Sequence, residues 1–208
     1  AGGPHPASVL IPETVETWWS PDGSAEIRHD AAAPIWPSRE DHATWNVAAP
    51  APSAGTRTDN VANAAGGLDA YPSDPTALAH RLAGEIEGAA ADRAGLTFER
   101  LREIRNSNAS PALVAATYRV AADLPGLRTF GAAIDQLGRP GIAVGLDSDY
   151  SGKLTRYELI VDPTSGRVLE YQELLLEAVS FLQARPPVQI AFEIHADEGS
   201  VTKTGARP

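Results

Sequence analysis

Residues 124–147 read LPGLRTFGAAIDQLGRPGIAVGLD, and residues 156–175 read RYELIVDPTSGRVLEYQELL. Short apolar runs alternate there with glycine, proline and aspartate, a pattern typical of antiparallel strands joined by tight turns. The clearest turn contains Asp162, Pro163 and Gly166, which supply a side-chain acceptor, a fixed φ and a residue that tolerates positive φ. The stretch therefore predicts a β-hairpin within a run of consecutive antiparallel strands.

Helical patterns come before these strands. Asp74 and Pro75 suit the N-cap and first position of a helix that Ala89–Ala91 would extend towards Gly95. Further helices are predicted from about Thr97 and from Ser110. The apolar stripes of the three helices are Leu78, Leu82 and Ile86; Phe98, Leu101 and Ile104; and Leu113, Thr117, Val120 and Leu124.

The remaining segments complete the predicted architecture. Residues 1–12 are rich in glycine and proline and predict a flexible N-terminal segment, while 13–208 are expected to form a single domain. Two short strands are expected between Val15 and Trp45, and a long surface loop over residues 46–73. VQIAFEIHA, residues 188–196, predicts the final strand, and VTK, residues 201–203, an added edge strand. The predicted class is α+β, with a curved antiparallel sheet and about three helices on one face.

Charge and composition restrict the function. The 208 residues carry a formal net charge of −10 at pH 7, which argues against a nucleic-acid partner because phosphate binding depends on lysine and arginine. A local basic cluster is formed by Arg100, Arg102 and Arg105, beside Glu99 and Glu103. A solvated helix face with ion pairs is favoured over a patch for an anionic ligand. The absence of cysteine excludes thiolate catalysis and cysteine metal sites.

The sharpest chemical motif lies between two predicted strands. Asp147, Asp149, Ser151, Gly152 and Glu158 match positions one, three, five, six and twelve of an EF-hand calcium loop. An EF-hand has a helix on each side, whereas these flanks are strand-like. A hydrated hairpin turn is therefore favoured over a calcium site.

Other candidate side chains carry little catalytic signal. There is no Gly-x-Ser-x-Gly motif, and the histidines lack zinc-like spacing. His29 and Asp30 with Asp41 and His42 are interpreted as surface polar residues rather than a cluster, and His195 as solvent-facing or hydrogen-bonded at a strand end. We therefore predict no catalytic, cofactor-binding or metal-binding residue, and no cofactor.

All four tryptophans lie within the first 45 residues. Trp18 and Trp19 are adjacent and would point to opposite faces of a strand. Packing of Trp18, Trp36 or Trp45 into a core is favoured, with a ligand-binding or docking surface as the alternative.

Several sequence blocks occur in a characteristic order. They are ETWWSPDGS (16–24), PSDPTALA (72–79), LPGL (124–127), GRPGIAV (138–144), ELIVDPTSGRVL (158–169) and GARP (205–208). In this order, which covers about Glu13 to Pro208, the chain resembles the uncharacterised actinobacterial CU044_5270 family. The resemblance implies a soluble extracytoplasmic region of a single-span membrane protein, whose membrane anchor lies outside this chain.

These observations favour a non-enzymatic extracytoplasmic sensor or interaction domain. The expected partner is a lipid or small apolar ligand, or an envelope protein, and contact with the membrane would be made only through the anchor. A calcium-stabilised structural module using the 147–158 loop is the alternative, and a hydrolase ranks last.

Overall fold

A computed structural model describes residues 8–36, 38–48, 54–62, 67–86, 90–179 and 185–208. The chain divides into two compact units. The N-terminal unit is Ala1–Gly66 with Val179–Ala184 and Lys203–Gly205, and the C-terminal unit is Gly67–Ala178 with Arg185–Thr202 and Ala206–Pro208. The sequence predicts that residues 13–208 fold as a single domain, and this stays a prediction.

The N-terminal unit contains an antiparallel sheet in the order β1 (Glu13–Trp19), β2 (Ala25–Ala31) and β3 (Gly55–Val61). The two predicted strands and their turn are confirmed, and Gly23 in this turn has φ 81°. Residues 1–7 of the predicted flexible segment lie outside the described residues.

The loop predicted over residues 46–73 is wrong where β3 lies. Because β3 is an edge strand with mostly exposed side chains, it forms without the large apolar residues that would have revealed it. Residues 49–53 and 63–66 of this stretch lie outside the described residues.

Helix α1 (Arg39–Ala48) was not predicted. Ser38 precedes it, and its hydroxyl accepts a hydrogen bond from the Asp41 backbone N–H at 3.0 Å. The Asp41 carboxylate in turn accepts from that hydroxyl at 2.5 Å. The spacing Ser-x-x-Asp is a variant of the capping box, so a local signal for this helix was present in the sequence.

The C-terminal unit contains the antiparallel β4–β8 sheet, in which the strands are paired in chain order. Its strands are β4 (Arg128–Ile134), β5 (Pro140–Ser148), β6 (Thr155–Val161), β7 (Val168–Leu175) and β8 (Val188–Ile194). The β6–β7 hairpin is confirmed, since Asp162 accepts from the Thr164 N–H and Gly166 has φ 72°.

The predicted edge strand at residues 201–203 is wrong. Pairing along β7 ends where the backbone N–H of His195 donates to the Leu169 carbonyl at 2.9 Å. The chain then leaves the sheet as irregular structure, so residues 201–203 have no neighbouring strand in register.

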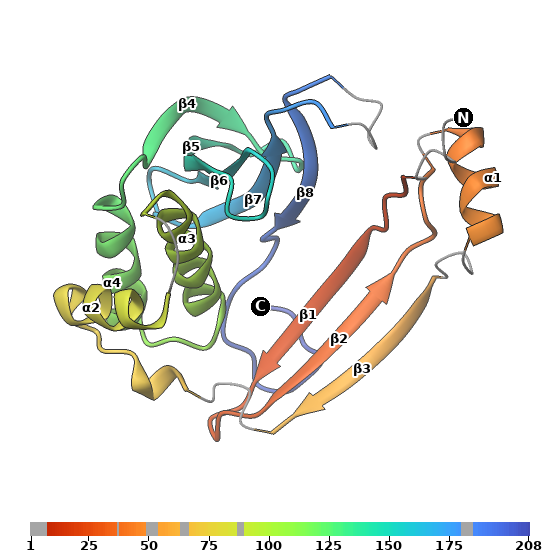
Figure 1. The fold of residues 1–208 in the computed structure, drawn as a ribbon. Coiled ribbons are helices and arrows are strands. Elements are labelled where there is room, and N and C mark those ends of the chain that lie inside the picture. Colours follow the sequence, from red (N-terminus) through yellow and green to blue (C-terminus); the bar gives the residue numbers. More distant parts are fainter. Residues whose placement is uncertain (1–7, 37, 49–53, 63–66, 87–89, 180–184) are drawn as a thin grey trace. The chain divides into compact units, whose positions relative to one another are not determined.

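The helices α2 (Pro75–Glu85), α3 (Ala90–Asn106) and α4 (Pro111–Ala122) group beside the β4–β8 sheet (Figure 1). The predicted starts of α2 and α4 are confirmed, because the side chains of Asp74 and Ser110 cap them and proline follows each cap. The predicted boundary near Gly95 is wrong, because α3 begins at Ala90 and runs through this glycine. A Cβ at Gly95 would lie 2.6 Å from Ser148 Oγ, so this glycine allows close packing and does not end a helix.

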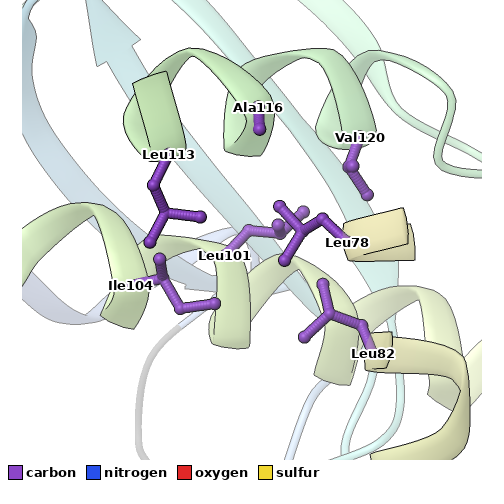
Figure 2. Packing of buried hydrophobic residues seen from close by; sticks show 7 residues of the cluster. All are labelled: Leu78, Leu82, Leu101, Ile104, Leu113, Ala116 and Val120. Atoms are coloured by element: carbon purple, nitrogen blue, oxygen red, sulfur yellow. The ribbon is translucent and has the colours of Figure 1, made fainter. Parts of the chain in front are cut away.

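The three helices share one hydrophobic core. Figure 2 shows leucine, isoleucine, alanine and valine side chains from α2, α3 and α4 directed towards one another. The core residues are Leu78, Leu82, Leu101, Ile104, Leu113, Ala116 and Val120. A second cluster, comprising Ala94, Phe98, Leu146, Tyr157 and Tyr171, packs α3 against the sheet.

The α+β class and the antiparallel sheets are therefore confirmed. The number of helices beside the β4–β8 sheet agrees with the prediction, while α1 and the β1–β3 sheet belong to the other unit. Within the described residues, no helix has the length and apolar character needed to cross a membrane.

Candidate functional site

A cleft lies between α3, α4 and the β4–β8 sheet, all within the C-terminal unit. Its volume is about 30 Å³, which exceeds the roughly 10–15 Å³ that one water requires. Its walls are apolar and consist of Phe98, Leu101, Ala121, Leu159 and Val168. Its polar lining consists of Arg102, Arg105, Asn106, Thr117 and Tyr118. We refer to this feature as the α3–α4 cleft.

Helical periodicity explains why α3 contributes both apolar and polar side chains to the cleft. Phe98, Leu101 and Arg105 follow one another at spacings of three and four on α3, so they share a face. The sheet contributes Leu159 from β6 and Val168 from β7, strands that the 162–166 turn connects. Two helices and a hairpin thus enclose the cleft, because Ala121 comes from α4.

Arg102 binds several groups at the cleft. Its guanidinium donates to Glu99 at 2.9 Å and to Glu193 of β8 at 2.8 Å. Its Cζ atom lies 4.2 Å from the centre of the Tyr171 ring, within range of a cation–π interaction. Asn106 also donates to Glu193, at 3.2 Å. Since the Arg102 side chain is only 20% exposed, these contacts link α3 firmly to β7 and β8.

Arg105 is the least exposed arginine of the cluster, with 10% of its side chain accessible. It lies within 3.1 Å of the Glu198 carboxylate, which also approaches Arg167 at 3.8 Å. Glu198 belongs to residues 195–202, an irregular segment that follows β8. We call this segment the C-terminal strap. One carboxylate of the strap therefore lies against two arginines, and one of them, Arg105, lines the cleft.

His195 begins the strap and is largely buried. Its Nε2 atom has no hydrogen-bond partner and lies 3.6 Å from a Glu193 oxygen, beyond hydrogen-bonding distance. Burial lowers the pKa of His195, although Glu193 acts in the opposite direction. The neutral imidazole is consequently favoured in the folded protein.

A second set of hydrogen-bonded polar side chains joins α3 to the sheet. The Tyr171 hydroxyl lies 2.8 Å from Glu99 and 2.9 Å from Glu173. One hydroxyl proton cannot fully satisfy two carboxylates, and burial raises the pKa of Glu99. Tyr171 and the two carboxylates therefore form one hydrogen-bonded group that joins α3 to β7.

The predicted arginine cluster divides into two parts. Arg100 is 44% exposed and pairs with Glu103 at 2.6 Å, as expected for a solvated helix face. Arg102 and Arg105 lie instead at the cleft and are mostly buried. Ion pairing is confirmed for all three, but solvation of the whole cluster is wrong, because α3 lies against the sheet.

The EF-hand-like stretch forms the β5–β6 hairpin, as the favoured interpretation predicted. Asp147 accepts hydrogen bonds from Arg156 at 2.8 Å and Arg128 at 2.5 Å, which hold its pKa below the usual range although burial acts against them. Glu158 accepts from Gln172 at 2.5 Å. Within the described ranges, no three histidine or acidic side chains converge as a metal site.

The histidine and aspartate pairs of the N-terminal unit make separate contacts. His29 lies 3.1 Å from Glu13 and 3.5 Å from Asp59, across the β1–β3 sheet. His42 packs against Trp36, with ring centres 4.8 Å apart. Asp41 forms part of the N-terminal cap of α1 through its hydrogen bonds with Ser38.

The four tryptophans are all half-buried, so none of them is fully enclosed in a core, and packing of Trp18, Trp36 or Trp45 into a core stays a prediction. Trp36 and Trp45 pack edge to face, with ring centres 5.8 Å apart. Arg28 lies over the Trp18 ring at 5.8 Å.

Sequence reasoning missed most of the α3–α4 cleft. The spacing of Arg102 and Arg105 along the stripe of Phe98 and Leu101 was the one available signal. Tyr118 and Glu198 carried none, because they reach the cleft through tertiary packing and through the course of the strap.

Comparisons with protein-family models, curated proteins and solved structures found no match to this chain. The α3–α4 cleft therefore has to be interpreted from its own geometry and chemistry.

Proposed function

We propose that the chain is a non-enzymatic interaction domain that works outside the cytoplasm, as the outer part of a membrane-anchored protein. The resemblance of its sequence blocks to the CU044_5270 family supports the extracytoplasmic location. The α3–α4 cleft supports the binding role, and it is the observation on which the proposal mainly rests.

An open apolar cleft is suited to receiving an apolar group. Protein interiors are packed so closely that voids larger than water are few. Side chains around such a void lack dispersion contacts that a bound group would supply. The volume of about 30 Å³ suits the end of one aliphatic side chain better than a lipid acyl chain. We therefore favour a protein segment as the partner over a lipid.

Filling the cleft from within tests this function. Ala121 lines the cleft near the end of α4, whereas its neighbour Ala122 is exposed. In Ala121→Leu the added side chain occupies the cleft, and in Ala122→Leu the same change points into solvent. The probe is 3-methyl-1-butanol, which carries the branched end of a leucine side chain without charge.

We expect the probe to shift backbone amide resonances of cleft residues in the unmodified protein and in Ala122→Leu. In Ala121→Leu these shifts should fall at least about fivefold, because loss of roughly 1 kcal/mol of apolar contact weakens binding by that factor. Thermal unfolding of both variants verifies that they fold. Equal shifts in all three proteins would show that the probe binds elsewhere.

A further inference from the structure

The C-terminal strap places one acidic side chain where a partner of the α3–α4 cleft would place its own. Glu198 lies against Arg105 and Arg167, and Val168 beside Arg167 forms part of the cleft wall. The strap is held at one end by the largely buried His195, whereas residues 196–200 are exposed and have no regular secondary structure. A surface carboxylate on such a segment can be replaced by another carboxylate at little cost.

Arg105 needs an anionic partner beside the cleft. Arg105 is 10% exposed, so removing Glu198 would leave a largely buried guanidinium without its ion-pair partner. Unpaired buried charge is costly, and an incoming carboxylate would relieve that cost. Arg167 is 46% exposed and can reorient towards the same carboxylate.

We propose that the strap is a displaceable internal ligand, and that the partner of the cleft is an acidic protein segment with one aliphatic side chain. The aliphatic group enters the cleft while a neighbouring carboxylate replaces Glu198 at Arg105 and Arg167. This inference rests on the proposed function, because it names the chemistry of the partner for the same site.

Charge complementarity is local in this mechanism. The chain as a whole carries a net charge of −10 and repels acidic segments at a distance. The arginines beside the cleft provide the attraction at contact, where Glu198 already shows how a carboxylate fits. The strap therefore keeps the site closed to weakly matching segments and lowers the apparent affinity of the true partner by competition.

The test uses the full chain and two synthetic peptides. The first is acetyl-Asp-Glu-Leu-Glu-Asp-amide, and the second replaces its leucine with alanine. Glu198→Gln removes the internal competitor. Glu177→Gln is the matched control, because Glu177 is similarly exposed, pairs with Lys153 at 3.7 Å and changes the net charge by the same amount.

We expect Glu198→Gln to bind the leucine peptide about three- to fivefold more tightly than the unmodified protein, since the partly exposed ion pairs of Glu198 no longer have to be broken. Glu177→Gln should bind within about twofold of the unmodified protein, and the alanine peptide should bind all three more weakly. Hydrogen exchange at residues 196–200 should accelerate when the leucine peptide saturates the unmodified protein.

The outcomes separate this inference from the proposed function. The proposal that the strap is an internal ligand would be overturned if Glu198→Gln and Glu177→Gln bound the leucine peptide with equal affinity. It would also be overturned if the peptide left hydrogen exchange at residues 196–200 unchanged. Binding of 3-methyl-1-butanol in the cleft without binding of either peptide would overturn the acidic partner and leave the apolar cleft supported. Failure of both probes to reach the cleft would overturn both.

Discussion

At the scale of single residues, His195 makes the stability of the folded protein depend on pH. Its imidazole is largely buried, and the groups facing it are Glu193, Glu198, Arg102 and Arg105. Burial lowers its pKa in the folded state below the ordinary 6.5. The unfolded chain therefore binds a proton at this position more readily than the folded protein does.

This difference predicts how acid affects stability. The contribution of the neutral His195 is complete above pH 6.5 and is lost as the pH falls from there through the lowered pKa of the folded state. His195→Asn removes the titration, so the stability advantage of the unmodified protein over this variant should shrink on going from pH 8 to pH 5. Urea unfolding at both pH values measures the difference.

The control for this prediction is His80→Asn, because His80 lies exposed on α2. Subtracting the stability change of His80→Asn at each pH corrects for the general effect of replacing a histidine with asparagine on a helix surface. An advantage over His195→Asn that grows on acidification would contradict the assignment of a neutral, buried imidazole.

At the scale of elements, the contact between α3 and β5 depends on Gly95. A Cβ there would meet Tyr150 Cδ1 at 2.5 Å and Ser148 Cβ at 2.8 Å. Ser148 is 3% exposed, so it has little room to move. Alanine normally stabilises a helix interior relative to glycine, but at this point it forces the helix and strand apart.

Two glycine-to-alanine changes should therefore have opposite effects. Gly84 lies in α2 with no atom within 4 Å of an added Cβ, and Gly84→Ala should raise the free energy of unfolding by about 0.5–1 kcal/mol. Gly95→Ala should lower it by about 1–3 kcal/mol. Urea denaturation measures both, and stabilisation by Gly95→Ala would refute the close approach of α3 to β5.

The same elements show what could be predicted from sequence. Asp74 before Pro75 marked the start of α2, and Asp162 to Gly166 marked the β6–β7 turn, because caps and turns depend on a few adjacent residues. Gly95 was misinterpreted as a helix boundary, since its role depends on Ser148, more than fifty positions away.

In the cleft, too, the features set by neighbouring residues could be predicted and those set by distant residues could not. Phe98 and Leu101 of its helical wall were visible as part of an apolar stripe, whereas Arg105 was assigned to a separate basic cluster. The opposite wall at Leu159 and Val168, and the carboxylate of Glu198, come from elements that a helical pattern cannot specify. Site residues contributed by tertiary contact were therefore out of reach of the sequence.

At the scale of the whole molecule, the two units differ in their buried cores. Both hydrophobic clusters belong to the C-terminal unit. Among the described residues of the N-terminal unit only Ala25 is buried, and Val15 and Val61 are exposed. Small sheets need an apolar face packed against other structure to be stable on their own.

Truncation tests the consequence and also the prediction of a single domain. A fragment of residues 67–208 should unfold cooperatively in urea, because it retains both hydrophobic clusters. A fragment of residues 1–66 should show no cooperative transition. If residues 67–208 also fail to fold, the two units form one interdependent domain. If residues 1–66 fold alone, the expectation that this unit needs other structure for its stability is wrong.

Nuclear Overhauser effects can locate a bound apolar group and so show directly whether the α3–α4 cleft binds one. With 3-methyl-1-butanol added to the unmodified protein, we expect contacts from the probe methyl groups to the methyl groups of Ala121, Leu159 and Val168. Contacts confined to exposed apolar residues such as Ile134 and Phe192 would contradict the α3–α4 cleft as the binding site.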